Sequence, residues 1–138
     1  MSFLIDTNVL SEIRKGRRCD PNVAAWFASV DDSGVYVSVL VLGEIRRGIE
    51  MLRRRDAAQA LALQHWLNRA SADFSDRLLP IDRAVADEWG RLSAIRTVPV
   101  VDGLLVSTAR VHGMTFVTRN IADVAGLGAF VLNPFKAG

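Results

Sequence analysis

Short apolar runs alternate with amphipathic helical segments along the whole chain, and this alternation constrains the possible folds most strongly. The runs that we predict as strands are residues 3–5, 35–37, 78–81, 115–117 and 129–132. The segments between them carry apolar residues at helical spacing, as at Val23, Trp26, Phe27 and Val30. Strands that alternate with helices predict an α/β fold, in which a mainly parallel central β-sheet is flanked by α-helices on both faces.

Capping signals mark where several helices begin and end. Asp20 followed by Pro21 predicts one helix start, and Ser38 and Asp82 predict two others. The helix after Ser38 and the helix over residues 56–72 are close in sequence and can form a hairpin. The last apolar helix is expected to begin at Asp102 and to end near residue 113, and residues 16–18 to form a loop. The apolar residues expected on the inner faces of the hairpin are Val41, Ile45, Ile49, Leu52, Leu61, Leu63, Trp66 and Leu67.

The length and composition of the chain predict one compact domain. Of the 138 residues, 50% are hydrophobic and 23% are charged, which excludes a disordered chain and allows one continuous core. A lone cysteine, Cys19, excludes an internal disulfide, and the N-terminus resembles neither a signal peptide nor a membrane span. We therefore expect a single domain over residues 1–138, in the cytoplasm and without a membrane partner.

Arginine dominates the basic residues of the chain. Of the 17 basic residues only Lys15 and Lys136 are lysines, which leaves fifteen arginines, and eight of these cluster within residues 14–18, 46–47 and 53–55. The guanidinium group matches the geometry of phosphate, so the clusters are consistent with a nucleic-acid footprint. An arginine-rich solvated surface explains them equally well, and the net charge of +2 does not decide between the two interpretations.

Four carboxylates occur where an apolar run meets a helix or turn. Asp6 follows the first predicted strand, Glu44 lies about two turns into the helix after the second, Asp102 opens an apolar helix, and Asp123 follows the strand over residues 115–117. In open α/β sheets, ligands bind beyond the carboxyl ends of the strands. We therefore expect the four acids to converge at one edge of the sheet.

Converging carboxylates predict a metal site. They repel one another unless one takes up a proton or a cation lies between them. Mg²⁺ and Mn²⁺ prefer hard oxygen ligands and usually combine one or two carboxylates with water and substrate phosphate. At a phosphodiester, such ions activate water and neutralise charge on the leaving oxygen, so the pattern is typical of a nuclease.

Each acid also has an ordinary structural explanation. Asp6 can cap a helix, Glu44 can pair with Arg47, Asp102 can cap the helix after Pro99, and Asp123 can close a turn. Caps of this kind are common in α/β proteins, so spacing alone leaves the metal site and the structural roles equally open.

Four sequence blocks resemble one known family in order and in approximate spacing. The chain is similar to the PIN-domain toxins of the VapC type, nearest to their FitB-like branch, and its closing residues 131–135 (VLNPF) also resemble that branch. Four matching blocks are far more specific than any one alone. The blocks are residues 4–12 (LIDTNVLSE), 37–48 (VSVLVLGEIRRG), 102–109 (DGLLVSTA) and 117–123 (VTRNIAD).

The resemblance implies a PIN fold and an endoribonuclease that depends on Mg²⁺ or Mn²⁺. The acidic quartet of the family falls on Asp6, Glu44, Asp102 and Asp123, with Asp6 and Asp102 as the expected direct metal ligands and the other two completing the pocket or orienting water. Further family positions are supporting residues: Asn8, Thr118, Arg119 and Asn120. Asn120 has an equally plausible role as a helix N-cap.

The resemblance also implies partners. Proteins of this type are toxins that a cognate antitoxin neutralises, they pair as homodimers, and they meet DNA only through the antitoxin. Candidate contacts to RNA or to the antitoxin are Arg14, Arg46 and Arg47. Candidates for an antitoxin groove or a dimer surface are Trp26, Trp66, Met51 and Leu52, although a buried core position is the more usual fate of such residues.

The chain departs from the family pattern at two places. Residues 95–101, before the third acid, form a shorter stretch than is usual, and Val124 stands where phenylalanine is commoner. The first change can alter the entrance for substrate or the start of the helix at Asp102, and the second is expected to affect packing.

Three other functions compete with the nuclease. An aspartyl-nucleophile enzyme needs a second aspartate two positions after Asp6, where Asn8 stands, and a signalling receiver needs paired early acids and a late lysine within the fold. The stronger rival is a PIN-fold interaction module that keeps the pocket but only binds a partner or nucleic acid.

Overall fold

The computed structural model describes residues 1–136 and contains a central sheet of five parallel strands. The strands are β1 (Phe3–Ile5), β2 (Val35–Ser38), β3 (Leu78–Leu79), β4 (Thr115–Val117) and β5 (Val131–Leu132). Their order is β3-β2-β1-β4-β5, and every neighbouring pair is parallel. The α/β prediction is therefore confirmed, and β1 lies at the centre of the sheet with Asp6 directly after it.

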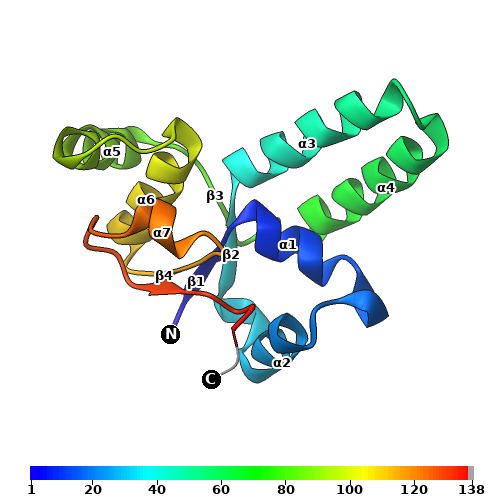
Figure 1. The fold of residues 1–138 in the computed structure, drawn as a ribbon, viewed down its shortest axis with the longest axis horizontal. Coiled ribbons are helices and arrows are strands. Elements are labelled where there is room, and N and C mark those ends of the chain that lie inside the picture. The colour runs from blue at the N-terminus through cyan, green and yellow to red at the C-terminus, as the bar shows by residue number, and fades with distance from the viewer. Residues whose placement is uncertain (137–138) are drawn as a thin grey trace.

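Seven α-helices cover the two faces of the sheet. They are α1 (Thr7–Ile13), α2 (Pro21–Ser29), α3 (Val39–Arg53), α4 (Ala57–Asp73), α5 (Arg83–Ile95), α6 (Val100–His112) and α7 (Ile121–Val124). Helices α1 to α4 lie on one side of the sheet and α5 to α7 on the other (Figure 1). This division follows from the strand order, because the chain moves outward from β1 to β3 and then returns across the sheet to β4 and β5 with right-handed connections.

The predicted caps form as expected. Asp20 accepts hydrogen bonds from the backbone N–H groups at the start of α2, Ser38 accepts one from Leu40, and Asp82 accepts one from Val85. Gly113 ends α6 in the left-handed conformation, with φ of 66°. Such side-chain caps satisfy the free donors of the first turn, so local sequence fixes these helix ends.

Five details of the fold differ from the sequence prediction, and one of them is that β3 covers only Leu78–Leu79 rather than residues 78–81. Residues 16–18 form a 3-10 turn rather than an irregular loop, and the last strand covers only Val131–Leu132 rather than four residues. Helix α6 begins at Val100 with Pro99 at the N-cap position, so the prediction that it begins at Asp102 is wrong. Leu61 is 50% exposed, because the buried face of α4 consists of Ala60, Leu67 and Ala70, and the residue after Ala60 is rotated away from it.

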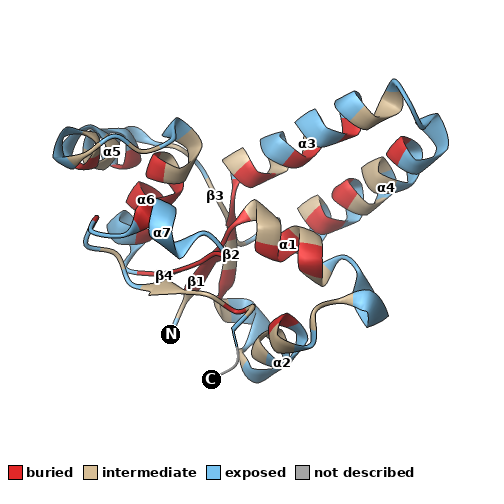
Figure 2. Cartoon of the chain, in the orientation of Figure 1, coloured by how far each residue is buried: buried red, intermediate tan, exposed pale blue. Residues whose placement is uncertain are grey.

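One apolar core joins the sheet to its helices. Leu4, Ile5 and Phe116 in the central strands are almost completely buried, and Val41 and Ile49 reach the same core from α3. Helices α3 and α4 form the expected hairpin, whose outer turns are largely exposed (Figure 2). The hairpin therefore extends from the core near the end of β1, and the first turns of α3 lie beside the carboxyl edge of the sheet (Figure 1).

Among the described residues, no single helix is both long and apolar enough to cross a membrane. Helices α5 and α6 satisfy that test only as a pair, and they are bent by 119° relative to each other. Six of the thirteen residues of α6 are buried, including Leu105, Val106 and Ala109.

Candidate metal-dependent nuclease site

Asp6 is the centre of the candidate site and also the N-cap of α1. Its Oδ1 accepts a 2.7 Å hydrogen bond from the backbone N–H of Thr7, and its Oδ2 accepts hydrogen bonds from Thr118 Oγ1 at 2.7 Å and Asn8 Nδ2 at 3.3 Å. Only 5% of Asp6 is exposed. Asp6 can therefore cap α1 and also belong to a metal site. Its Oδ1 caps the helix, and its Oδ2 accepts the hydrogen bond from Thr118, which follows β4.

Thr118 connects the end of β4 to Asp6 across 112 residues of sequence. Its hydroxyl group is fully buried, donates to Asp6 and accepts from the backbone N–H of Asn120 at 3.1 Å. Because one hydroxyl hydrogen serves one acceptor, the Asn120 N–H directs that hydrogen toward Asp6. Thr118 thus holds the carboxylate in a fixed orientation at the edge of the sheet.

Asn8 and the segment after β4 complete this network. The Asn8 side chain donates to Asp6 and accepts from the backbone N–H of Arg119 at 3.3 Å. Arg119 and Asn120 therefore support the network through backbone N–H groups. The Asn120 side chain makes no capping bond although the residue occupies the N-cap position of α7.

Glu44 joins the site through a residue that the sequence did not reveal. Its Oε1 accepts a 2.6 Å hydrogen bond from Thr7 Oγ1, so the first residue of α1 links the second acid to the first. Glu44 is exposed on α3 and makes no ion pair with Arg47 among the described residues, so that alternative is wrong. A threonine directly after Asp6, at the start of a helix, is the only sequence signal for this link.

Asp102 and Asp123 approach the site from the other side of the sheet. Asp102 lies in the first turn of α6 and is partly buried, whereas Asp123 lies in α7 and is exposed. Pro99 occupies the N-cap position of α6, so Asp102 does not cap that helix, contrary to one of the structural alternatives. No side-chain hydrogen bond within residues 1–136 accounts for the position of Asp102.

The electrostatic effects show that the acids act on one another. Burial raises the pKa of Asp102, and the negative charges of Asp6, Asp123 and Glu44 raise it further. Burial also raises the pKa of Asp6, with a smaller contribution from Glu44, although the hydrogen bonds from Thr118, Thr7 and Asn8 oppose the shift. Negative charge on Asp6 and Asp102 is therefore unfavourable unless a cation lies nearby, and the charges of Glu44 and Asp123 contribute to that effect.

Arg96 fixes the segment that carries Asp123. Its guanidinium group donates to the backbone carbonyl of Asp123 at 2.9 Å and to that of Ala125 at 2.8 and 3.1 Å. Sequence reasoning drew attention to the short stretch over residues 95–101 but not to this arginine. This stretch is short because it connects α5 directly to α6. Arg96 holds it against α7 through the hydrogen bond to the carbonyl of Asp123.

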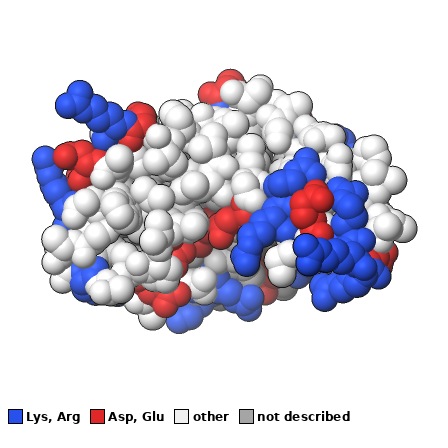
Figure 3. All heavy atoms as spheres, turned by 90° about the horizontal axis from the view of Figure 1, so that it is seen from above, with Lys and Arg blue, Asp and Glu red and all other residues white. Residues whose placement is uncertain are grey.

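The three predicted basic contact residues do not form one cluster around the acids. Arg14 lies at the opposite end of α1 from Asp6, and Arg46 pairs with Glu50 at 3.3 Å on α3. Arg47 is exposed and makes no ion pair among residues 1–136. Seen from above, basic atoms gather on the α3–α4 hairpin, beside acidic atoms near the middle of the same face (Figure 3).

The donor chemistry of the site fits a hard divalent cation. All four ionisable groups are carboxylates, with a threonine hydroxyl and an asparagine amide beside them, and neither histidine nor cysteine is among them. Within residues 1–136, however, no three acidic, histidine or cysteine side chains are arranged to hold a metal ion alone. Magnesium does not require such a cage, because water and substrate phosphate usually supply most of its ligands.

A family model of the PIN domain matches residues 3–122, which is most of the chain. The chain belongs to the PIN domain family. Its sequence is 29% identical over 141 residues to Toxin FitB from Neisseria gonorrhoeae, a match that covers 96% of this chain and 98% of that protein. It is also 37% identical over 81 residues to Ribonuclease VapC14 from Mycobacterium tuberculosis, covering 59% of this chain and 71% of that protein.

Two solved structures of DNA-bound complexes contain chains with the same fold. The FitAB complex bound to an IR36 DNA fragment contains a chain that superposes with a TM-score of 0.87 at 27% identity, covering 99% of this chain and 97% of that one. A chain of DNA-bound VapBC from Salmonella typhimurium superposes with a TM-score of 0.78 at 18% identity, covering 97% and 98%, and this likeness shows the fold alone.

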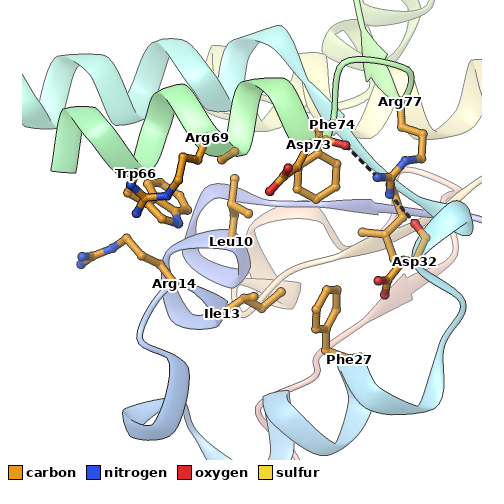
Figure 4. Close-up of a pocket in the computed structure, with 12 residues that line it drawn as sticks. Leu10, Ile13, Arg14, Phe27, Asp32, Trp66, Arg69, Asp73, Phe74 and Arg77 are labelled. Carbon is orange, nitrogen blue, oxygen red and sulfur yellow. Dashed lines mark hydrogen bonds between the residues drawn. The ribbon is translucent and has the colours of Figure 1, made fainter. Parts of the chain in front are cut away.

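The PIN domain also contains a separate cavity of about 390 Å³ between α1, α2 and α4. Leu10, Phe27 and Trp66 line it together with Arg14 and Arg69, as Figure 4 shows. None of the four acids lines this cavity, so the cavity and the acidic site are separate. Of the apolar candidates for a groove, Trp66 lines this cavity, Trp26 lines another hollow, and Met51 is 60% exposed on α3.

Proposed function

We propose that this PIN domain, comprising residues 1–138, is a metal-dependent endoribonuclease and the toxin of a toxin–antitoxin module. The observation that carries the proposal is the convergence of four acids from separate parts of the chain. One hydrogen bond joins Asp6 to Thr118, which follows β4, and another joins Thr7 to Glu44 on α3. The negative charges of the other three acids raise the pKa of Asp102. The name of the relative VapC14 supports ribonuclease chemistry, and that of FitB supports the role as a toxin.

The four acids form two pairs with different proposed roles. Asp6 and Asp102 are the direct ligands of Mg²⁺ or Mn²⁺, since both are partly withdrawn from water and both have carboxyl pKa values raised by burial and neighbouring charge. A bound cation at this position would polarise the scissile phosphate and activate water. Glu44 and Asp123, which are exposed, complete the pocket or orient the attacking water.

The surrounding residues hold these acids in place. Thr118 and Asn8 fix the Asp6 carboxylate, Thr7 fixes Glu44, and Arg96 fixes the backbone at Asp123. Hydrogen-bonded supports of this kind keep ligands oriented before the metal or substrate arrives. Arg46 and Arg47 lie on the same helix as Glu44, so they are candidates for contacts with the RNA backbone or with the antitoxin.

A cognate antitoxin is the proposed protein partner, and DNA contact would be indirect, through that antitoxin. The structure of FitAB bound to a DNA fragment supports this assignment. The cavity lined by Leu10, Phe27 and Trp66 offers an apolar surface with Arg14 at its rim, which suits a docked antitoxin segment. We also propose that the protein forms a homodimer and acts in the cytoplasm.

The deciding experiment measures RNA cleavage by purified protein freed of any antitoxin. We expect single-stranded RNA to be cut in the presence of Mg²⁺ or Mn²⁺, cutting to stop when EDTA is added, and excess metal to restore it, because the acids alone supply no electrophile. Asp6→Asn should fold and remain inactive.

The controls separate this function from a non-catalytic interaction module. Equal cleavage by the wild type and Asp6→Asn would indicate a contaminating nuclease and remove the support for catalysis. Binding of RNA or antitoxin without any metal-dependent cleavage would favour the interaction module.

A further inference from the structure

A second hollow of about 570 Å³ lies between α2 and the segment that follows β5. Asn22, Ala25 and Trp26 line it from α2, Leu132 and Asn133 line it from the end of β5, and Ile121 lines it from α7. We call it the α2–β5 groove. None of the four acids lines it, and no role in the proposed cleavage reaction has been given to it above.

A short series of hydrogen bonds connects the acidic site to this groove. Asn8 donates to Asp6 and accepts from the backbone N–H of Arg119, and the carbonyl of Arg119 accepts from Asn133 Nδ2 at 3.5 Å. Ile121, on the groove wall, is two residues from Asp123. The groove is therefore connected to the acidic site through Asn8 and the segment that follows β4.

The groove offers a flat aromatic surface whose orientation is fixed. The Trp26 ring packs edge to face against Phe3, with ring centroids 5.4 Å apart and an interplanar angle of 88°. Phe3 is buried in β1, so the indole ring is braced by the sheet. Unpaired bases stack on aromatic side chains of this kind, and stacking tolerates any base because every base has a π-face.

Polar groups flank the aromatic surface. Asn22 Nδ2 donates a hydrogen bond to the carbonyl of Phe135. Asn22 Oδ1 makes no hydrogen bond among the described residues and can accept one from a ligand. The Nδ2 group of Asn133 makes only its long bond to Arg119 and can donate. One acceptor and one donor on opposite walls match the exposed edge of a nucleobase.

Two positively charged side chains lie near the C-terminal segment that lines the groove. The Arg119 guanidinium group lies over the Phe135 ring at 4.3 Å, and Lys136 lines the groove. Both charges are therefore held near the C-terminal segment, where a phosphate that links the cleavage site to the groove would pass. An antitoxin carboxylate would match the same charges but would not explain the apolar ring and the paired amides.

We infer that the α2–β5 groove binds one unpaired nucleotide of single-stranded RNA next to the scissile phosphate, with its base stacked on Trp26 and its phosphate at Arg119. The inference depends on the proposed ribonuclease function and adds a substrate subsite to it. The subsite favours an unpaired strand, because a base within a duplex cannot reach the indole ring.

The main test fills the groove without disturbing the core. Ala25 is exposed and lines the groove, whereas Ala24 is exposed on the same helix and does not line it, so Ala25→Glu and Ala24→Glu make the same change in charge at neighbouring positions. We expect Ala25→Glu to weaken the binding of a labelled single-stranded RNA of about ten nucleotides by roughly tenfold, the scale of one lost base stack. Binding is measured in the inactive Asp102→Asn background, and Ala24→Glu should leave it within about twofold of the parent.

A photocrosslinking measurement locates the base directly. RNA that contains 4-thiouridine, bound to Asp102→Asn protein and irradiated, should crosslink to peptides that contain Trp26 or Asn133. Trp26→Phe should retain binding because it keeps an aromatic face, and Trp26→Leu should lose it.

The outcomes distinguish the subsite from the function on which it depends. Equal RNA affinity and equal KM for Ala25→Glu and Ala24→Glu, with normal cleavage, would overturn the subsite and leave the nuclease intact. Loss of antitoxin binding by Ala25→Glu with unchanged RNA affinity would identify the groove as a protein-docking surface and also overturn the inference. Absence of any RNA binding or cleavage by the wild type would remove both proposals.

Discussion

Asp102→Asn is expected to abolish RNA cleavage and, at the same time, to make the metal-free protein more stable. The activity should fall by at least a factor of about 10²–10³, the usual scale for losing one electrostatic contact to a developing charge. The stability should rise because burial and the charges of Asp6, Asp123 and Glu44 all disfavour ionised Asp102, and asparagine removes that charge. A gain of about 1 kcal/mol is typical of relieving an unfavourable functional site.

The pH dependence of this stability gain follows from the direction of the pKa shift. The pKa of Asp102 is raised in the folded state above its ordinary value of 3.8, so the folded protein holds that proton more tightly than the unfolded chain. Wild-type stability should therefore fall, relative to Asp102→Asn, as pH rises from about that value through the raised pKa. Below this window the two proteins should be equally stable, because both carry a neutral side chain.

Thermal unfolding in EDTA across a pH series checks this expectation, together with a cleavage assay in Mg²⁺. Asp87→Asn is the matched control, because Asp87 is an exposed aspartate of α5 whose partner Arg91 is also on the surface. It should leave activity and stability nearly unchanged. Full activity of Asp102→Asn, or lower stability than wild type at neutral pH without metal, would contradict the proposed charge cluster.

Phe116→Ala should destabilise the whole protein. Phe116 is 1% exposed and lies in β4, where it pairs with Leu4 of β1 and Val131 of β5. Its truncation leaves a cavity in the centre of the core and should cost about 3–5 kcal/mol. Total stabilities are typically about 5–15 kcal/mol, so Tm should fall by roughly 10–20 °C, and cleavage should be lost at the temperature at which the variant unfolds.

Phe130→Ala provides the control for this core substitution. Phe130 is 80% exposed, although its backbone carbonyl accepts a hydrogen bond from the N–H of Phe116 in the sheet. The alanine variant keeps that backbone bond and should change stability by no more than about 0.5 kcal/mol. Denaturant unfolding of both variants provides the comparison, and equal destabilisation would show that the position of β4 in the core has been misassigned.

Local sequence signals predicted the fold because they act over a few residues. Asp20 with Pro21, Ser38 and Asp82 each supply a cap within their own helix, and Gly113 supplies the left-handed end of α6. The parallel sheet then follows from the alternation of strands and helices. The prediction that Leu61 lies on the inner face of α4 is wrong. The sequence pattern alone does not distinguish an apolar residue on that face from one next to it.

The candidate site was predictable only in part, because its decisive contacts join distant residues. The acids could be placed at helix starts and strand ends, but the hydrogen bond between Thr7 and Glu44 spans 37 positions and has no local signature. The same holds for Arg96, whose acceptors are the carbonyls of Asp123 and Ala125. Arg14 was predicted as a contact to RNA or to the antitoxin, and the structure places it at the opposite end of α1 from Asp6.

The central claim is that four acids from separate elements form one site for a divalent cation. The measurement that tests it most directly is a titration of Mn²⁺, with free Mn²⁺ detected by electron paramagnetic resonance, on the wild type and on Asp6→Asn, Glu44→Gln, Asp102→Asn and Asp123→Asn. We expect saturable binding to the wild type, weakened by about tenfold or more in the Asp6 and Asp102 variants and by a smaller factor in the other two, with Asp87→Asn unchanged. Absence of saturable binding to the wild type, or wild-type affinity in all four variants, would contradict the claim.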